Sequence, residues 1–427
     1  MTLIKNGHVI DPKSGLDEVL DVLIQNGTII GFGKYAEEEG IQTVIDASGC
    51  VVAPGLVDTH VHFRDPGLTY KEDVITGAAA AAAGGYTTVI CMANTKPVVD
   101  NVETLTDLRE REAALPVHVL NAACVTRGMQ GQELTDMEAL RAAGAVGFTD
   151  DGLPIKDVRL MVDALRKVRE LNVPISLHEE DPALIGSAGI NRGAVSAQLG
   201  VPGASAAAEE TMVARDCVLA LHTGARVNIQ HLSSGVSVEL VRLMKQLGAD
   251  VWAEATPQHF SLNEEIVVER GTLAKVNPPI RTETDRLALI RGLKDGTIDM
   301  IATDHAPHAE DEKAQDLTHA PSGMIGLETA LALGITNLVH KGHLTLPELL
   351  EKMTVRPAAL YNLSCGDLHV GGAADLVIFN ENEQWTVPEH FHSRSCNSPF
   401  IGMTLYGKVK YTLCGGAIIY QDRKEEN

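Results

Sequence analysis

Two histidines and an arginine recur at every second residue in the segment GLVDTHVHFRDPG, residues 55–67. Because side chains alternate between the two faces of a strand, Asp58, His60, His62 and Arg64 would point the same way. Neutral imidazoles two residues apart on one face can bind a single metal cation. The same spacing also arises in an ordinary half-buried strand, so the segment indicates a metal site only if further ligands lie nearby.

Further candidate ligands follow other short apolar segments. Each lies where a strand is expected to end, and in a parallel barrel these ends meet at one rim. The set comprises Asn94, Asp150, Asp151, His178, His231, Asp304, His305 and His308. Nitrogen and oxygen donors of this kind suit zinc or a similar transition metal. They also suffice for two ions about 3.5–4 Å apart, with a carboxylate such as Asp151 as the bridging ligand.

Each of these residues has an ordinary structural explanation when it is considered alone. A histidine at the end of a strand is more often a hydrogen-bonded polar residue than a metal ligand. Asp150, Asp151 and Gly152 form a common turn sequence, in which glycine supplies a positive φ. The convergence of the whole set on one expected rim is what favours the metal site.

The strands that must position these side chains alternate with helices from about residue 54 onward. We expect strands at 55–63, 86–93, 117–123, 145–149, 174–178, 226–232, 250–255 and 299–304. Segments 157–171 and 235–248 carry apolar residues at steps of three and four, which predicts helices. Eight strand–helix units predict an α/β fold, a (β/α)8 barrel of the TIM type. A doubly wound open sheet is the alternative, but no glycine-rich phosphate loop follows the first strand.

The two ends of the chain show a different pattern. Residues 1–53 and 367–427 alternate apolar and polar residues between glycine and asparagine turns, which predicts antiparallel strands. Since these segments flank the barrel, we expect them to pair into one composite β domain, a small β-sandwich. The barrel itself is then expected to span residues 54–366.

Composition excludes several classes of protein. Hydrophobic residues make up 44% of the 427 residues and charged residues 22%, as in ordinary globular proteins. The formal net charge of −22 disfavours nucleic acid and anionic membranes as partners, and means that an anionic substrate needs a local cation. The seven cysteines are scattered without a CxxC pair, and neither a leader peptide nor an apolar run of membrane-spanning length is present. We therefore expect a cytoplasmic protein with reduced thiols.

Seven segments together resemble the cyclic amidohydrolases, and in particular the bacterial dihydroorotases of the longer type. They are GLVDTHVHFRDPG, MANTKP, FTDDG, SLHEED, QHLSS, VNPPIR and IATDHAPH, and the resemblance covers nearly the whole chain. It implies a hydrolase acting on a cyclic amide C–N bond. The reaction would be the reversible, zinc-dependent cyclisation of N-carbamoyl-L-aspartate to (S)-dihydroorotate and water in pyrimidine biosynthesis.

The resemblance also implies a set of metal ligands. For two Zn²⁺ ions these are His60, His62, Asp151, His178, His231 and Asp304. The first two histidines would bind one ion and the other two the second, with Asp151 as the bridge and Asp304 as both a ligand and the catalytic proton carrier. In hydantoinases the bridging ligand is usually a carboxylated lysine. Here Lys156 lies too far along the chain from the turn, which favours a dihydroorotase.

Substrate contacts are implied in the same way. They are His62, Arg64, Asn94, Asn277, His308, Ser322 and Gly323. Arg64, Asn94 and His308 resemble the residues that hold the substrate carboxylate in the family, and the others would contact the ring. A guanidinium can bind a carboxylate in bidentate fashion, which suits a dianionic substrate in an acidic protein. The alternative for Arg64 is an ion pair with the neighbouring Asp65.

Two other functions compete with this one. Another cyclic amidohydrolase, such as allantoinase or hydantoinase, would act on a ring without a carboxylate. A catalytically inactive barrel would serve as a structural partner of a neighbouring enzyme, but the presence of every expected ligand disfavours this reading. The resemblance also implies a homo-oligomer, and it is compatible with an association with aspartate transcarbamoylase.

Overall fold

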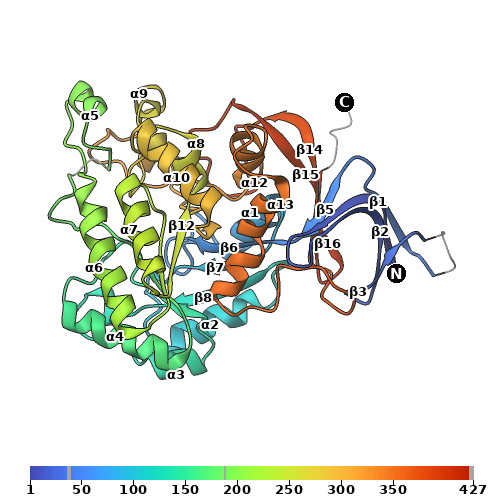
Figure 1. The fold of residues 1–427 in the computed structure, drawn as a ribbon, viewed down its shortest axis with the longest axis horizontal. Helices are drawn as coiled ribbons and strands as arrows, with labels where there is room; N and C mark the ends of the chain where they lie inside the picture. The colour runs from blue at the N-terminus through green and yellow to red at the C-terminus, as the bar shows by residue number, and fades with distance from the viewer. Residues whose placement is uncertain (36–39, 187–188, 423–427) are drawn as a thin grey trace.

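Eight parallel strands form a barrel in the middle of the chain, and the computed structural model describes residues 1–35, 40–186 and 189–422 (Figure 1). In chain order the barrel strands are β6 (Leu56–Val61), β7 (Tyr86–Cys91), β8 (His118–Ala123), β9 (Gly147–Phe148), β10 (Ile175–Leu177), β11 (Val227–Ile229), β12 (Val251–Ala255) and β13 (Met300–Ile301). Each strand pairs with the next one in the sequence. A parallel bridge between Val61 and His305 joins the first strand to the segment after the last. The expected TIM-type α/β barrel is confirmed, and every strand lies inside its expected range.

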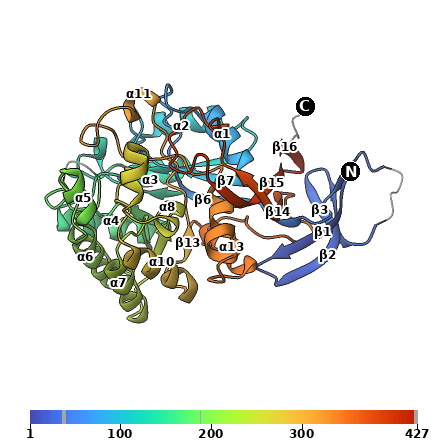
Figure 2. The same ribbon diagram turned by 90° about the horizontal axis from the view of Figure 1, so that it is seen from above.

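Helices cover the outside of the barrel (Figures 1 and 2). The longer ones are α1 (Val74–Ala83), α2 (Val102–Glu112), α4 (Val158–Leu171), α6 (Ala207–Thr223), α7 (Gly235–Gln246), α10 (Glu283–Asp295) and α13 (Leu346–Met353). Short α-helices are α3 (Met137–Ala142), α5 (Ala194–Leu199), α8 (Pro257–Ser261), α9 (Ile266–Arg270), α11 (Glu310–Lys313), α12 (Ala330–Gly334) and α14 (Val355–Leu360). Single turns at Arg127–Met129, Gly271–Ala274 and Ile335–Val339 complete the list.

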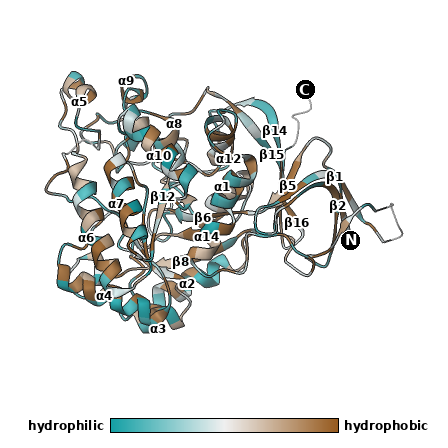
Figure 3. Cartoon of the chain, in the orientation of Figure 1, coloured by the Kyte–Doolittle hydropathy of each residue, from teal (hydrophilic) through white to brown (hydrophobic). Residues whose placement is uncertain are grey.

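Helix α4 shows how the sequence sets these elements. Asp157 caps its first turn by accepting hydrogen bonds from the backbone N–H groups of Arg159 and Leu160, and Asn172 ends it in the left-handed conformation. Its buried residues are Met161, Ala164, Leu165 and Val168, at the spacing of one helix face. In Figure 3 both hydrophobic and hydrophilic residues colour this helix, as expected of one that packs one face against a barrel. The helices expected at 157–171 and 235–248 are both present.

The two chain ends build one eight-stranded sheet, called here the end sheet. It contains β1 (Thr2–Asp11), β2 (Leu16–Gln25), β3 (Thr28–Gly33), β4 (Thr43–Asp46), β5 (Val51–Pro54), β14 (Leu376–Thr386), β15 (Thr404–Cys414) and β16 (Ala417–Gln421). The ends meet where β5 pairs with β14. The sheet encloses a core of its own, which includes Ile4, Val22, Ile29, Ile45 and Ile378.

The end sheet differs from the expected antiparallel pattern at two strand pairs. Strands β4 and β5 both pair with β1 in parallel, whereas the other pairs are antiparallel. Strand β2 pairs with one edge of β1, and β4 and β5 pair with its other edge and run in the direction of β1. Tight hairpins join only antiparallel neighbours, so turn signals in the sequence do not reveal these two pairs.

Strand β14 joins the end sheet to the barrel. Its neighbouring residues Ile378 and Phe379 belong to two different cores, that of the end sheet and that of the barrel, because successive side chains of a strand face opposite ways. None of the helices in the described residues has the length and apolar character needed to cross a lipid bilayer.

Truncation of Phe379 should therefore loosen the barrel from the end sheet. Phe379 has no solvent exposure, so we expect Phe379→Ala to lower the free energy of unfolding by about 3–5 kcal/mol, through lost burial and the cavity it leaves. Urea denaturation measures the change. Asn382→Ala, at an exposed position of the same strand, should change it by less than about 0.5 kcal/mol. Equal effects of the two substitutions would contradict this account of the junction.

Candidate active site

A pocket of about 210 Å³ opens where the barrel strands end. Its lining is His62, Arg64, Asn94, Asp151, Gly152, His178, His231, Asn277, Asp304, Ala306, His308, Ser322 and Gly323. Every metal ligand and substrate contact that the family resemblance implied lines this pocket except His60, which lies fully buried in the adjoining metal-ligand cluster. The volume is below the roughly 300–1,000 Å³ of pockets for drug-sized ligands, so the space suits a small metabolite.

The first group of candidate ligands surrounds the pair of histidines on β6 and just beyond it. The Nε2 atom of His60 lies 3.5 Å from an oxygen of Asp151 and 3.5 Å from an oxygen of Asp304. The Nε2 atom of His62 lies 3.0 Å from the same Asp304 oxygen and 3.5 Å from the second oxygen of Asp151. Four residues from three strand ends thus direct donor atoms into one small volume.

A second group shares Asp151 with the first. The Nδ1 atom of His178 lies 3.9 Å from Asp151 Oδ1 and 2.9 Å from the Nε2 atom of His231. All three residues are buried, and their donor atoms lie within 4.8 Å of one another. Asp151 is therefore the residue common to both groups, as a bridging ligand must be.

The donor set fits divalent cations. Ligands about 2.0–2.1 Å from a tetrahedral zinc ion stand about 3.3 Å apart, and the donor distances here run from 2.9 to 3.9 Å. The buried Nε2 atom of His60 has no hydrogen-bond partner among the described residues, although it faces two carboxylates. A neutral ring nitrogen in that position could offer its lone pair to a cation that the two carboxylates also bind.

The electrostatics of the pocket agree with this fit. Burial would raise the pKa of Asp151, but attraction by the imidazoles of His60, His62 and His178 holds that pKa well below its usual range. Burial would lower the pKa of His60, but Asp151 and Asp304 raise it well above its usual value, so positive charge is favoured beside them. Burial and the neighbouring His178 lower the pKa of His231, which keeps this imidazole neutral and able to bind a metal.

The backbone at three strand ends directs the side chains into the pocket. Arg64, His231 and Asp304 adopt left-handed conformations, with φ values of 59°, 33° and 49°. Such conformations cost residues other than glycine about 1–3 kcal/mol each and concentrate at functional sites.

Buried polar residues that the sequence reasoning missed surround His60. Glu254, on β12, lies 3.3 Å from the Nδ1 atom of His60 and accepts hydrogen bonds from Thr59 and Asn228. If the Nδ1–H of His60 donates to Glu254, the Nε2 lone pair points to the carboxylates. The available signal was a charged residue within the otherwise apolar strand VWAEA. Asp58, on the strand before His60, accepts hydrogen bonds from the backbone N–H groups of His60 and Thr303.

We expect Glu254→Gln to weaken metal binding by about 10–100-fold. The neutral amide removes the negative charge beside His60 Nδ1 and no longer fixes the same tautomer of that imidazole. Competition with a chelator, followed by metal analysis of the protein, measures this change. Glu239→Gln, on the exposed face of α7, is the matched control and should bind metal as the unmodified protein does. Unchanged affinity in Glu254→Gln would show that Glu254 has only a packing role.

Glu180 plays a similar part for His178. Its Oε2 atom lies 3.2 Å from the Nε2 atom of His178, which leaves Nδ1 to face Asp151 and His231. The spacing of two residues in SLHEED placed Glu180 on the same face as His178, and this was the signal in the sequence.

The guanidinium of Arg64 lines the pocket and is not held by a protein carboxylate of the described residues. Its Nε atom donates to the carbonyl oxygen of Pro307 at 3.2 Å, and it forms no ion pair within the described part of the chain. The alternative partner Asp65 pairs instead with Arg111 at 2.7 Å. A half-buried guanidinium thus faces the pocket with donors to spare.

His308 and Asn94 line the pocket together with Arg64. The Nε2 atom of His308 lies 2.9 Å from the carbonyl oxygen of Ser322 and its Nδ1 atom 3.2 Å from Lys71. Burial and the neighbouring cations lower the pKa of His308 to about 3, so it is neutral at physiological pH. The amide of Asn94 contacts His62 at 2.9 Å and Asp151 at 3.0 Å, and so joins two of the metal-ligand candidates.

Ser322 and Gly323 form another part of the pocket lining, and neighbouring side chains hold their backbone in place. The Oγ atom of Ser322 donates to Asn277 at 3.2 Å. A side chain at Gly323 would come within 2.9 Å of the Nε2 atom of His308, so glycine is needed for this close approach. Lys313 is buried and donates to the carbonyl oxygens of Pro321 and Gly323, at 3.0 Å each, which fixes the wall.

Two members of the strand-end set do not join the metal-ligand groups. Asp150 accepts hydrogen bonds from the backbone N–H groups of Val125 and Thr126, and so shapes a loop. His305 lies 3.3 Å from Glu72 and accepts from the backbone of Gly326. Both are strand-end polar residues with structural partners, as the ordinary explanation foresaw.

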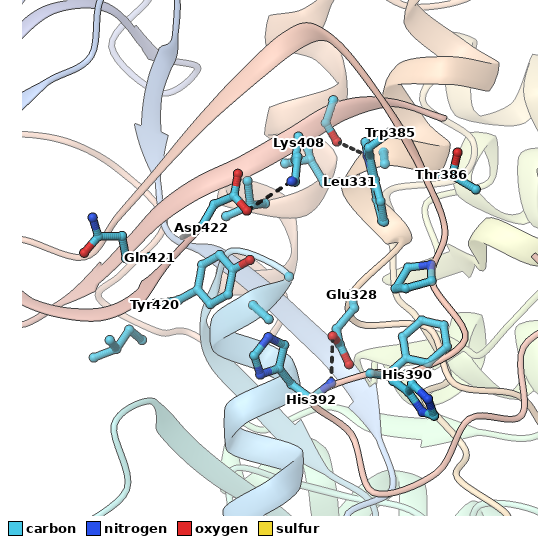
Figure 4. A pocket seen from close by; sticks show the side chains of 18 of the residues that line it. Glu328, Leu331, Trp385, Thr386, His390, His392, Lys408, Tyr420, Gln421 and Asp422 are labelled. Carbon is cyan, nitrogen blue, oxygen red and sulfur yellow. Dashed lines mark hydrogen bonds and ion pairs between the residues drawn. The ribbon is translucent and has the colours of Figure 1, made fainter. Parts of the chain in front are cut away.

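A larger cavity lies elsewhere and has a different character. It has a volume of about 920 Å³ between α12 and the end-sheet strands β14, β15 and β16. Figure 4 shows Trp385, Tyr420, Lys408 and Glu328 around it. None of the metal-ligand candidates lines this cavity, so size alone does not identify the reactive site.

Comparisons with known proteins agree with the geometry. A family model described as "Dihydro-orotase-like" matches residues 49–237. A dihydroorotase of Clostridioides difficile is 59% identical over 420 residues, which cover 98% of this chain and 100% of that protein. A dihydroorotase of Clostridium acetobutylicum is 54% identical, with 99% of this chain and 100% of that protein covered.

Among solved structures, L-hydantoinase (dihydropyrimidinase) from Arthrobacter aurescens superposes with a TM-score of 0.88 at 26% identity, covering 99% of this chain and 96% of that one. Dihydropyrimidinase from Brevibacillus agri reaches a TM-score of 0.86 at 22% identity, covering 99% and 95%, and shares the fold.

Proposed function

The chain belongs to the dihydroorotase family, and we propose that its barrel pocket carries out the reaction of that family with two bound cations and the side chains described above. The reaction is the reversible cyclisation of N-carbamoyl-L-aspartate to (S)-dihydroorotate and water, in the synthesis of pyrimidines. In the hydrolytic direction the enzyme is a hydrolase of a cyclic amide bond. One observation carries the assignment: two groups of metal-ligand candidates share Asp151 inside one pocket that also contains Arg64.

The proposed cations are two Zn²⁺ ions. His60 and His62 would hold one ion, His178 and His231 the other, and Asp151 would bridge them with Asp304 as a further ligand. When bound, such ions lower the pKa of a water molecule to about 7 and polarise a carbonyl oxygen. The neutral imidazole of His231 and the ionised carboxylate of Asp151 are in the protonation states that this binding needs.

Asp304 is the proposed proton carrier. Burial would raise its pKa, but attraction by His60 and His62 lowers it, so the carboxylate is ionised and can act as a base. In the hydrolytic direction it would take a proton from the attacking water and deliver it to the departing ring nitrogen. In the direction of ring closure, it would take the proton from the attacking nitrogen.

The proposed substrate contacts divide the pocket into two sides. Arg64 would bind the substrate carboxylate, with Asn94 and His308 beside it. His62, Asn277, Ser322 and Gly323 would contact the ring. Because the net charge of the chain is −22, this local cation is what permits an anionic substrate to bind.

A direct assay tests the proposal. Purified, zinc-loaded protein should close N-carbamoyl-L-aspartate to dihydroorotate and should open dihydroorotate in the reverse assay. Hydantoin and allantoin should be turned over at least about tenfold more slowly than dihydroorotate, because neither has a carboxylate that could pair with Arg64. Faster turnover of hydantoin would assign the pocket to a hydantoinase. No turnover of any substrate by protein with two bound zinc ions would favour an inactive scaffold.

We also propose how the chain is divided and where it acts. Residues 54–366 would form the catalytic barrel, and residues 1–53 with 367–427 a composite β domain, a division that sheet membership supports. A cytoplasmic location is supported by the seven cysteines, all of which are free thiols. Exposed apolar residues of the end sheet, Val19, Ile30 and Val44, are compatible with a homo-oligomer. Light scattering of the purified protein, alone and mixed with aspartate transcarbamoylase, measures both associations.

A further inference from the structure

Three side chains with metal-binding atoms meet at the foot of the barrel, the end where the strands begin. His118 is the first residue of β8, Asp375 immediately precedes β14, and Cys414 is the last residue of β15. The pocket described above lies at the other end of the strands. This cluster is therefore separate from the reaction site, and it brings one barrel strand together with the end sheet.

The reactive atoms of the cluster converge on one position. The Nε2 atom of His118 lies 3.1 Å from Asp375 Oδ2 and 3.4 Å from the Sγ atom of Cys414. The donor atoms of all three residues lie within 4.8 Å of one another. The other carboxylate oxygen of Asp375 accepts the backbone N–H of Gly415 at 2.6 Å, which fixes the orientation of the carboxylate.

These distances match the edges of a small metal coordination shell. Around a tetrahedral Zn²⁺, with bonds of about 2.3 Å to sulfur and about 2.0–2.1 Å to nitrogen and oxygen, sulfur and nitrogen stand about 3.6 Å apart and nitrogen and oxygen about 3.3 Å. The observed 3.4 and 3.1 Å are close to both values. A thiolate, an imidazole and a carboxylate form a donor set that zinc prefers to calcium or magnesium.

The cluster is accessible to solvent. The His118 side chain is 53% exposed, so solvent reaches the cluster, whereas that of Asp375 is 11% exposed. An ion could thus enter from solvent, and a water molecule could complete its coordination.

We propose that His118, Asp375 and Cys414 form a further site for a single divalent ion, Zn²⁺ or a close analogue, that fastens the end sheet to the foot of the barrel. The three ligands are far apart in the sequence, and the residue numbers of His118 and Asp375 differ by 257. The unfolded chain cannot present them together. An ion at 100 times its dissociation constant would therefore favour the folded state by about 100-fold.

Cobalt substitution tests the proposal because it reports sulfur ligands separately. Metal-free enzyme is titrated with Co²⁺, and the near-ultraviolet absorption from sulfur-to-cobalt charge transfer is recorded. The ligands proposed in the barrel pocket carry only nitrogen and oxygen donors, so this band reports a cysteine ligand outside that pocket. We expect it to saturate at one equivalent per chain, and total bound metal to reach three ions per chain.

Two cysteine variants complete the design. Cys414→Ser should lose the band and one metal ion per chain, while it keeps dihydroorotate turnover within about twofold, because the barrel pocket is distant. Cys396→Ser, at an exposed cysteine outside the cluster, should keep both the band and the third ion. His118→Ala should weaken Co²⁺ binding at this site and remove the rise in thermal unfolding midpoint on metal addition.

Two results would overturn the proposal. One is the absence of a charge-transfer band from protein whose barrel pocket is loaded, which would leave a hydrogen-bonded Cys–His–Asp cluster without metal. The other is a band that persists in Cys414→Ser.

Discussion

Asp304→Asn should lower kcat for dihydroorotate hydrolysis by about 10²–10⁴-fold, the contribution expected of a positioned general base. Asparagine has nearly the same shape as aspartate but cannot accept and return a proton. The Asp304 carboxylate lies 3.0 Å from His62 and 3.5 Å from His60, so it stands at the centre of the candidate ligands rather than at the edge of the pocket. Steady-state kinetics in both reaction directions measures the loss.

Two controls separate lost proton transfer from lost metal. Metal analysis of Asp304→Asn should still find both barrel ions, since His60, His62 and Asp151 retain the first site. Asp316→Asn, at an exposed aspartate in the loop that follows, should leave kcat unchanged. A variant with both ions and a kcat within tenfold of the original would remove Asp304 from the role of proton carrier.

Arg64→Ala is expected to lower kcat/KM for N-carbamoyl-L-aspartate by about 10²–10³-fold. Truncating one partner of a desolvated charge pair typically costs about 2–5 kcal/mol, and here the unpaired partner would be the substrate carboxylate. The guanidinium is available for that partner because it pairs with no carboxylate of the described chain, and Asp65 is already held by Arg111.

Arg64→Lys is the matched variant. It keeps the charge but not the planar pair of donors, so it should recover part of the lost activity and remain about tenfold below the original. Hydrolysis of hydantoin, a ring without a carboxylate, should respond little to either substitution. If both variants handled carbamoyl-aspartate like the original protein, the carboxylate would have to bind elsewhere in the pocket.

Local patterns in the sequence were enough to place the barrel strands. Strands β6 to β13 lie within the expected segments because short apolar runs between helical periods are a local property. The rule that parallel strands end at one rim then brought residues as distant as His60 and Asp304 into one expected site. The directions of the strands in the end sheet could not be obtained this way. Strands β4 and β5 pair with β1 in parallel, and no hairpin turn in the sequence marks such a pair.

For the candidate site too, the sequence predicts some features and only the tertiary structure determines the others. Residue types and strand order, both readable from the sequence, determined that imidazoles and carboxylates would gather at one mouth and that a cation would suit them. Only the tertiary structure decided which atoms face one another: His178 toward His231, Asn94 between His62 and Asp151, and Glu254 behind His60. In the folded chain Asp150 accepts from the backbone of Val125 and His305 contacts Glu72, so neither joins the metal-ligand groups. The physical reason is that alternation along a strand fixes a face, whereas the direction of a side chain beyond the strand end depends on left-handed backbone conformations and on contacts between residues hundreds of positions apart.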